Sequence, residues 1–403
     1  MDFYFDYSCP YAYLAFTQLE RFETLAGKSA RLKPMLLGGV FASVGTAQNL
    51  MNELGPAKAA HNFADMQRWA AAFGQTLRMP PEHPRRTVEA LRATILAGVD
   101  RRVVAGFYRA YWVEGRAPSD PATMRDVLSS AGHDPTPILA RLGDADVKAS
   151  LRAATDEAIG HGIFGAPSIV TEDGALFWGQ DRLPFAFGLP LSSFFPSDFA
   201  PKDHAMQTPH TIELYWDFSS PFAYLGSTQA EAVAERTGAK LELRPMLLGA
   251  VFKAIGQVDV PLAAFSDAKK MYMLKDLQRW AAHYGVPFRW PSRFPMNTVK
   301  ALRAYLALPE ARRAAFRQAT FRAYWAEDRD ISDDAVLREL IGEGADEILA
   351  ATQTAPIKQA LFAATERAVS AGVFGAPTWI VDGKELYWGQ DRIVLVEHAL
   401  RAG

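Results

Sequence analysis

The chain has very little cysteine, because Cys9 is the only thiol among its 403 residues. A single cysteine excludes a disulfide within the chain and is typical of a protein from a reducing compartment. The sequence also has no block of Lys or Arg, and its 43 basic and 45 acidic residues give a formal net charge of -2. Since nucleic-acid binding depends on neutralising a run of phosphates, we expect no nucleic acid partner.

Long apolar runs and a secretory pattern are missing as well. The opening residues, Asp2 to Asp6, lack the basic and then apolar pattern of a signal peptide, and no apolar stretch is long enough to span a bilayer. We therefore expect a cytoplasmic protein that does not bind membranes. The eight histidines include no pair at metal-ligand spacing with acidic or cysteine neighbours, so we expect no metal site.

What the sequence does contain is a repeat of itself, offset by about 210 residues. DFYFDYSCPYAYL from Asp2 matches ELYWDFSSPFAYL from Glu213. The other pairs are LKPMLLGGVF from Leu32 with LRPMLLGAVF from Leu243, DMQRWAAAFG from Asp65 with DLQRWAAHYG from Asp276, TVEALRA from Thr87 with TVKALRA from Thr298, GIFGAP from Gly162 with GVFGAP from Gly372, and WGQDR from Trp178 and Trp388. Two copies of one fold are therefore expected.

The repeat sets the domain prediction. We predict a first domain over residues 1–187, a linker over residues 188–211 that is rich in Pro, Ser and Phe, and a second domain over residues 212–403. With 49% hydrophobic residues, the chain is long enough for two ordinary cores. We expect the two copies to pack against one another as a pseudo-dimer.

Each copy has the pattern of an α/β domain. In the second copy, alternation and turn residues predict strands at Thr211–Trp216 and Leu241–Met246, helices from Pro261 to about Leu349, a further helix ending at Gly372, a hairpin of Thr378–Val381 and Glu385–Trp388, and a last helix from Ile393. This order is that of a thioredoxin-like fold with an all-helical insertion. We predict two such domains in tandem.

The first candidate functional position is the turn before the opening helix, where Cys9 and Ser220 are equivalent. A proline follows each of them and suits the first helical turn, which makes each the predicted helix cap. A helix N-terminus offers free N–H donors and partial positive charge, so it stabilises a sulfur as thiolate. An isolated Ser-Pro pair is also typical of a plain helix cap.

Two further positions recur late in each copy. Ala166-Pro167 and Ala376-Pro377 come just before a strand, where a cis proline leaves backbone groups able to pair with an extended peptide. Each could equally be a proline that only opens a strand. Gln180-Asp181 and Gln390-Asp391 precede the final helix, where a carboxylate and N–H groups can receive a zwitterionic amino acid. The alternative for each Asp is a cap in an ion pair with the next Arg.

Taken together, these motifs resemble the 2-hydroxychromene-2-carboxylate isomerase and kappa-class glutathione transferase family. The resemblance covers both copies and rests on D-F-x-S-P-x-x-Y-L, R-P-x-L-x-G, Y-M-x-x-D-L-x-R-W, P-x-N-T, F-G-x-P and G-x-D-R in that order. It implies a thioredoxin-like fold, glutathione as cofactor, and a small aromatic or unsaturated electrophilic substrate, as in the degradation of aromatic compounds.

The resemblance also implies a role for each site residue. In the second copy, Ser220 corresponds to the serine that holds the glutathione sulfur, and Ala376, beside Pro377, to the residue whose backbone pairs with the cysteinyl part. Asp391 and Gln390 correspond to the γ-glutamyl binder, and Lys269 to a lysine near the glycyl carboxylate. It implies Asn297 as a substrate contact, and Lys58, Ala166, Pro167, Gln180 and Asp181 as cofactor contacts in the first copy. Apart from the resemblance, Tyr272 and Phe222 are aromatic residues near the site that suit an aromatic or apolar substrate, although such residues also build ordinary cores.

The first copy departs from the family pattern, because Cys9 replaces the serine and Arg86 stands where the second copy has Asn297. Cys9-Pro10-Tyr11-Ala12 looks like the reactive turn of disulfide oxidases without its second cysteine, so a dithiol cycle is not available. We expect Cys9 to be a reactive thiolate that forms a mixed disulfide or attacks an electrophile. The alternative is an inert residue in a decayed site.

The implied reaction is isomerisation, in which the thiolate adds to an unsaturated aryl keto acid, a bond rotates, and elimination returns the cofactor. A kappa-like transferase is closely related. Two other classes remain open: a thiol redox enzyme that uses Cys9, and a non-catalytic duplicated scaffold.

Overall fold

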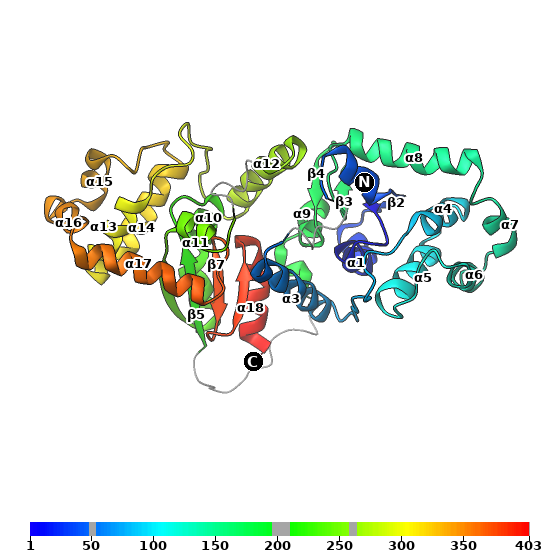
Figure 1. Cartoon of the computed structure of the whole chain (residues 1–403), viewed down its shortest axis with the longest axis horizontal. Helices are drawn as coiled ribbons and strands as arrows, with labels where there is room; N and C mark the ends of the chain where they lie inside the picture. The colour runs from blue at the N-terminus through cyan, green and yellow to red at the C-terminus, as the bar shows by residue number, and fades with distance from the viewer. Residues whose placement is uncertain (48–53, 196–209, 258–263, 403) are drawn as a thin grey trace. The chain divides into compact units, whose positions relative to one another are not determined.

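The computed structural model describes residues 1–47, 54–195, 210–257 and 264–402 (Figure 1). These residues form two compact units. The described residues within 1–54, 63–200 and 266–269 make the first unit, and those within 55–62, 201–265 and 270–403 make the second. Within the described ranges, no helix combines the length and the apolar character that crossing a membrane requires.

Each half of the chain is built on a mixed four-stranded sheet, with strand order β2-β1-β3-β4 in the first half and β6-β5-β7-β8 in the second. The central strand pairs with the next strand of the sequence in parallel and with the third antiparallel. The strands are β1 (Asp2–Phe5), β2 (Arg31–Pro34), β3 (Ser168–Val170), β4 (Leu176–Trp178), β5 (Thr211–Trp216), β6 (Lys240–Pro245), β7 (Thr378–Val381) and β8 (Glu385–Trp388). Two thioredoxin-like domains in tandem are thus confirmed.

Helices follow the same order in the two halves. Those of the first half are α1 (Pro10–Ala26), α2 (Leu37–Ser43), α3 (Pro56–Ala72), α4 (Val88–Leu96), α5 (Arg101–Trp112), α6 (Pro121–Ser130), α7 (Pro135–Ala140), α8 (Ala145–Gly160) and α9 (Leu183–Phe187). Those of the second half are α10 (Pro221–Thr237), α11 (Leu248–Ala254), α12 (Asp267–His283), α13 (Val299–Ala307), α14 (Glu310–Trp325), α15 (Asp334–Ile341), α16 (Ala345–Ala351), α17 (Ala355–Ser370) and α18 (Ile393–Ala402).

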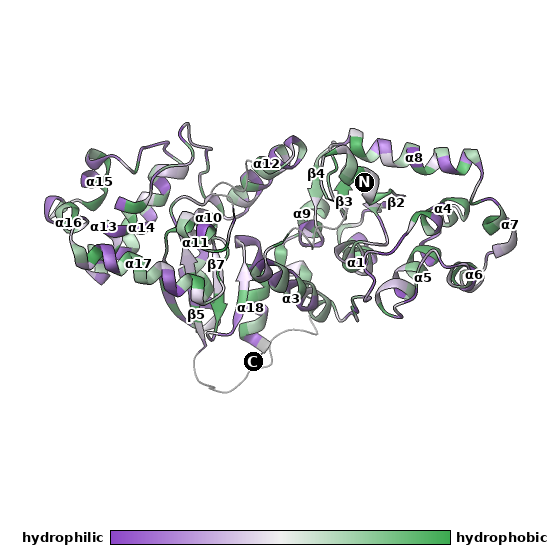
Figure 2. Ribbon diagram, viewed as in Figure 1, coloured by the Kyte–Doolittle hydropathy of each residue, from purple (hydrophilic) through white to green (hydrophobic). Residues whose placement is uncertain are grey.

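The inserted helices contact one another and the sheet through apolar faces. Within the first half, Figure 1 shows α4 to α7 clustered together, with α4 beside β2, and Figure 2 shows hydrophobic and hydrophilic patches alternating along α8. In the second half, Trp216 at the end of β5 packs against Phe218, Tyr305 and Phe321, with ring centroids 4.9, 4.9 and 5.6 Å away. Burial of such aromatic surface joins the insertion to the sheet.

The opening helix of the second half shows how local sequence fixes an element. Ser220 has extended backbone angles and caps α10, Pro221 occupies its first turn, and Gly238 ends it in the left-handed conformation with φ 66°. Proline at the start and glycine past the end are the arrangement that helix geometry favours. The predicted cap at Ser220 is confirmed.

Most predicted elements of the second half are found, and β5, β7 and β8 have the predicted bounds. The prediction missed α11, a helix of only seven residues. It also assigned Leu191–Phe194 to the linker, whereas this segment forms a 3-10 turn in which Phe194 is buried against Phe22 and Trp69. The predicted helix start at Pro261 and linker residues 196–209 lie outside the described residues.

Close packing of a backbone against a ring yields a first prediction. A Cβ atom placed on Gly375 would collide with the indole of Trp388, so Gly375→Ala should lower the free energy of unfolding by about 1 to 3 kcal/mol. Urea denaturation followed by tryptophan fluorescence measures this change. Gly249→Ala is the control, because it lies in α11 with no atom within 4 Å of the added carbon, and it should not destabilise. Equal stability of the two variants would contradict the packing.

Candidate functional site

The site of the second half begins at the turn between β5 and α10. Because Ser220 is the cap of α10, its Oγ lies among the free N–H groups of the first turn and accepts a hydrogen bond from the Ala223 N–H at 3.1 Å. The same hydroxyl donates to the carbonyl oxygen of Ala376 at 2.8 Å. Ser220 is 4% exposed. One hydroxyl thus connects the positive end of a helix to the residue that precedes β7.

The peptide bond between Ala376 and Pro377 is cis, and so is the one between Ala166 and Pro167. The cis form that was one of the two alternatives at each position is therefore present, and pairing with an extended peptide stays a prediction. Ala166 lies in the first half where Ala376 lies in the second, and its carbonyl oxygen is likewise bonded to the cap of the opening helix. The two halves share this geometry.

Cys9 occupies the Ser220 position in the first half but differs in its chemistry. Its Sγ donates to the Ala166 carbonyl oxygen at 3.0 Å, and the residue is 7% exposed. Burial raises the pKa of the Cys9 thiol to about 12, and the N–H groups of Ala12 and Tyr11 oppose this only in part. This arrangement favours the neutral thiol over the thiolate expected from the sequence, because the desolvation of the sulfur exceeds the stabilisation by the helix end.

A buried carboxylate that the sequence analysis missed holds the turn of the second half in place. Asp217 accepts hydrogen bonds from the Ser219 N–H at 3.0 Å, the Leu248 N–H at 2.7 Å and the Thr298 hydroxyl at 2.7 Å. Burial raises the pKa of Asp217, while these donors act to lower it. Three separate segments therefore meet at one side chain, three residues before Ser220.

The first half repeats this arrangement at Asp6. Its carboxylate accepts from the Ser8 N–H at 3.0 Å and the Leu37 N–H at 2.8 Å, and the Thr87 hydroxyl also acts on its pKa. The signal available in the sequence was the aspartate at the same place in both copies, before Ser8-Cys9 and before Ser219-Ser220. Nothing in the pattern showed that the aspartate is buried.

Asn297, predicted to lie by the substrate, is exposed on the loop before α13. Its Oδ1 accepts a hydrogen bond from the Val299 N–H at 3.0 Å. The next residue, Thr298, is the one that donates to Asp217. The loop of Asn297 is therefore tied to the Ser220 turn through one intervening carboxylate.

The Gly-Gln-Asp-Arg segments form short 3-10 turns, Gln180–Arg182 and Gln390–Arg392, in front of the final helices. Asp391 pairs with Arg392 at 3.2 Å and Asp181 with Arg182 at 2.8 Å. The predicted alternative, an ion pair with the next arginine, is therefore present in both halves. An ion pair does not occupy every acceptor of a carboxylate, so the aspartates can still receive an ammonium group.

Glutamine side chains in the same turns are buried, at 2% exposure for both Gln180 and Gln390. The Nε2 atom of Gln180 has no hydrogen-bond partner among the described residues. A buried amide donor without a partner costs free energy, and a ligand carboxylate would satisfy it. This atom is the strongest indication in the first half that a ligand with an acceptor group binds there.

The two predicted lysines lie elsewhere than expected. Residues 55–62 belong to the second unit, where the Lys58 Nζ lies 5.0 Å from the ring centroid of Trp388 and the His61 Nε2 accepts from the Trp388 N–H at 3.2 Å. Residues 266–269 belong to the first unit, where the Lys269 Nζ lies 5.5 Å from the ring of Trp178. Each lysine therefore lies beside the WGQDR segment of the other copy, which differs from the predicted assignment.

The aromatic residues near the candidate site differ in how far they are exposed. Phe222 is partly exposed on the first turn of α10, close in sequence to Ser220. Tyr272 on α12 is buried, and its hydroxyl donates to Asp276 at 3.3 Å. Phe218 and Tyr7 are fully buried and belong to the cores. Among the described residues there is no group of His, Cys, Asp and Glu that could hold a metal ion.

Comparison with known proteins agrees with the duplicated fold. The family model of the DSBA-like thioredoxin domain matches residues 1–186 and again residues 211–401. A 2-hydroxychromene-2-carboxylate isomerase of Sphingobium xenophagum is 33% identical over 193 residues, which cover 47% of this chain and 97% of that protein. Glutathione S-transferase kappa 1 of Homo sapiens is 29% identical over 210 residues, covering 48% of this chain and 91% of that protein.

A solved structure is similar over a comparable share of the chain. The structure of a 2-hydroxychromene-2-carboxylate isomerase (HCCA isomerase) has 29% sequence identity and a TM-score of 0.42, and covers 47% of this chain and 93% of that chain. Each relative thus corresponds in length to one of the two copies. The relatives named are enzymes.

The buried carboxylates give a prediction of pH dependence. Because burial raises the native pKa of Asp217 above its ordinary value of 3.8, its contribution to stability is largest below that value and is lost as the pH rises through the raised pKa. Asp217→Asn removes this contribution. The difference in free energy of unfolding, wild type minus variant, should therefore increase as the pH falls from about 8 to about 4.

Urea denaturation at each pH measures this difference. Asp6→Asn is the matched variant in the first half, and it should show the same trend because burial also raises the pKa of Asp6. A difference that stays constant or shrinks on acidification would contradict the assignment of these carboxylates as buried and raised in pKa.

The chemistry of Cys9 gives a third prediction. Only the thiolate reacts rapidly with iodoacetamide, and burial raises the pKa of the Cys9 thiol to about 12. Alkylation of Cys9 at pH 7 should therefore be at least about tenfold slower in the native protein than in the urea-unfolded chain. Intact-mass spectrometry over time measures both rates on the same protein. Native alkylation as fast as in the unfolded chain would show that the sulfur is exposed and activated.

Proposed function

The chain belongs in both halves to the DsbA-like thioredoxin family, in the group that includes the 2-hydroxychromene-2-carboxylate isomerases and kappa glutathione transferases, and we propose that it is a glutathione-dependent enzyme of that group. The observation that carries the proposal is the Ser220 hydroxyl, which accepts from the Ala223 N–H and donates to the Ala376 carbonyl oxygen. A hydroxyl at the positive end of a helix is suited to hold an anionic sulfur.

The hydroxyl proton limits how Ser220 can act. A serine has one O–H donor, and that donor is bonded to the Ala376 carbonyl oxygen at 2.8 Å. To donate to a ligand sulfur, it must leave that carbonyl, whose lone pairs then need another donor. The amide N–H of a cysteinyl residue provides this donor, so sulfur and amide of one cysteinyl group satisfy both partners together. Ser220 and Ala376 are therefore complementary to a cysteine-containing peptide.

The other end of the peptide is complementary to the Gly-Gln-Asp-Arg turn. In the second half, Asp391 can receive the ammonium and Gln390 the carboxylate of a γ-glutamyl group. In the first half, the buried Nε2 of Gln180 lacks a partner and offers a donor for the same carboxylate. The Lys58 ammonium, beside the ring of Trp388 in the second unit, can pair with a glycyl carboxylate.

When bound, the cofactor supplies a thiolate that adds to an unsaturated aryl keto acid and is expelled after bond rotation. The chain contributes binding, orientation and charge stabilisation. Ser220 and the first turn of α10 stabilise negative charge on sulfur, and Asp217 fixes the turn that presents Ser220. Two residues near this turn are proposed to contact the substrate. Phe222 follows Ser220 on the first turn of α10, and Asn297 lies on the loop that Thr298 ties to Asp217.

We further propose that catalysis depends on the second half and that the protein acts in the cytoplasm. A redox role for Cys9 finds no support in its surroundings, because its thiol is buried, bonded to the Ala166 carbonyl oxygen and raised in pKa. A scaffold without activity would need no complementary peptide site. The packing of the two halves as a pseudo-dimer stays a prediction.

Substrate turnover tests the proposal. With 2-hydroxychromene-2-carboxylate followed by ultraviolet absorbance, the wild-type chain should convert substrate only when reduced glutathione is present, and the glutathione concentration should be unchanged at the end. Consumption of glutathione would instead identify a transferase. In a Cys9→Ala background, Ser220→Ala should lower turnover by about 10 to 1000 fold, because it removes one donor to developing negative charge.

Ser219→Ala is the control, since it removes a neighbouring hydroxyl that also bonds to Asp217 but keeps the Ser219 N–H bond to that carboxylate and the Ser220 hydroxyl. It should retain turnover within about threefold of the background, as expected of a partly exposed side chain that does not cap the helix. Full turnover by the Ser220→Ala variant in that background would remove Ser220 from the mechanism.

A further inference from the structure

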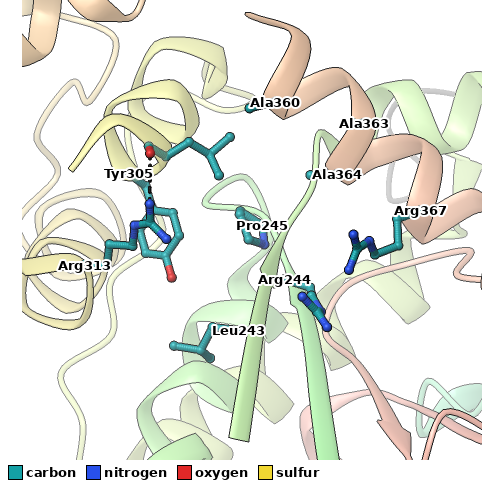
Figure 3. Close-up of a pocket in the computed structure, with 10 residues that line it drawn as sticks. Leu243, Arg244, Pro245, Tyr305, Arg313, Ala360, Ala363, Ala364 and Arg367 are labelled. Atoms are coloured by element: carbon teal, nitrogen blue, oxygen red, sulfur yellow. Dashed lines mark hydrogen bonds between the residues drawn. The ribbon is translucent and has the colours of Figure 1, made fainter. Parts of the chain in front are cut away.

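A cavity of about 240 Å³ lies in the second half, between β6 and the helices α13, α14 and α17 (Figure 3). None of Ser220, Ala376 and Gln390 lines it, so it is separate from the site described above. Three small residues of α17, Ala360, Ala363 and Ala364, leave the space open on one side. Its remaining walls carry three arginines, from β6, α14 and α17.

The three arginines differ in how far they are already bonded. Arg313 is fixed, because its Nε and Nη2 donate to the carbonyl oxygens of Leu308 at 2.9 Å and Leu306 at 3.0 Å. Its guanidinium also lies 5.7 Å from the ring centroid of Tyr305. This arginine therefore shapes the cavity and adds positive charge to it, but it has few donors left for a ligand.

Arg367 and Arg244 keep donors available. The guanidinium of Arg367, exposed on α17, makes no hydrogen bond or ion pair within the part of the chain that the structure describes. Arg244 donates its Nε to Glu213 at 2.7 Å and its Nη2 to Glu242, which leaves its Nη1 without a hydrogen bond to any described residue. Figure 3 shows both guanidinium groups projecting toward the same end of the cavity, one from α17 and one from β6.

The nearby hydroxyl of Tyr215 confirms that the two groups share one region. Burial raises the pKa of Tyr215, and Glu213 raises it further, whereas Arg244 and Arg367 both act to lower it. Both positive charges are therefore close enough to act on one phenol. The carboxylates of Glu213 and Glu242 offset the charge of Arg244 but make no ion pair with Arg367.

In the first half, the residues that correspond to Arg244 and Arg367 form an ion pair. The repeat aligns Lys33 with Arg244 and Glu157 with Arg367. There the Lys33 Nζ pairs with the Glu157 carboxylate at 3.0 Å, and the Tyr4 hydroxyl donates to the same carboxylate at 3.0 Å. In the second half arginine replaces this glutamate, so Arg367 has no carboxylate partner corresponding to Glu157, while Glu213 and Glu242 pair with Arg244. An anion bound beside Arg367 would be attracted by both guanidinium groups.

We propose that this cavity binds a small molecule through a phosphate or carboxylate group held between Arg244 and Arg367. Guanidinium groups present paired N–H donors whose geometry matches the oxygens of such anions. The alanines of α17, Leu243 and the ring of Tyr305 give the rest of the cavity an apolar lining that suits a short carbon skeleton. The bound anion takes the place that the Glu157 carboxylate has in the first half.

Titration calorimetry of the full chain tests the site, with inorganic phosphate and with succinate as probes at constant ionic strength set by sodium chloride. The wild type should bind at least one of them saturably, with one site per chain, and the probe that binds more tightly identifies phosphate or carboxylate as the natural group. Arg367→Glu should weaken that binding by at least about tenfold, since it restores the charge arrangement of the first half.

Lys33→Gln is the matched control, because it removes a cation from the equivalent place in the first half, where Glu157 already neutralises it. Its affinity for the probe should equal that of the wild type. Arg367→Gln provides a second variant that introduces no negative charge, and circular dichroism shows whether each variant is folded. No saturable binding of either probe, or equal binding by the wild type and the folded Arg367 variants, would overturn the proposal.

Discussion

The hydrogen bond between the Ser220 hydroxyl and the Ala376 carbonyl oxygen is the interaction on which the site depends. It joins residues 156 positions apart, so it exists only because the sheet brings the end of β5 beside the start of β7. Asp217 holds the turn from the other side through three donors. A helix end, a strand and a buried carboxylate therefore position one oxygen, and the fold around it serves to keep these three in register.

The two copies share this arrangement of helix end, strand and buried carboxylate, but the capping atom is an oxygen in Ser220 and a sulfur in Cys9. The sulfur of Cys9 donates to the Ala166 carbonyl oxygen as the Ser220 hydroxyl donates to that of Ala376. Unlike the Ser220 oxygen, it accepts no capping hydrogen bond from the start of its helix. Serine both accepts from the helix and donates to the strand, whereas a neutral thiol is a weak partner in either role. The same kind of divergence separates Glu157 from Arg367: the glutamate pairs with Lys33, whereas the guanidinium of Arg367 lines a cavity together with Arg244, whose charge Glu213 and Glu242 offset.

The parts of the molecule that could be predicted are those that depend on local pattern. Alternation placed β5, the turn at Asp382-Gly383 placed the hairpin of β7 and β8, and the Ser-Pro pair placed the start of α10. The short helix α11 escaped prediction because seven residues carry too little periodicity to identify. The burial of single side chains could not be predicted either, because it depends on segments that are distant in the sequence. This burial decides both the role of Asp217 and the raised pKa of Cys9. The positions of Lys58 and Lys269 follow from how the chain is divided between units, which sequence alignment does not show.

Calorimetric titration of the purified chain with reduced glutathione measures the central claim most directly. The account predicts saturable binding in the wild type, and a lower affinity for the thiol form in Ser220→Ala with little change for S-methylglutathione, whose sulfur cannot ionise. Absence of any binding of reduced glutathione to the folded chain would contradict the account, and so would an affinity that is the same with and without the Ser220 hydroxyl.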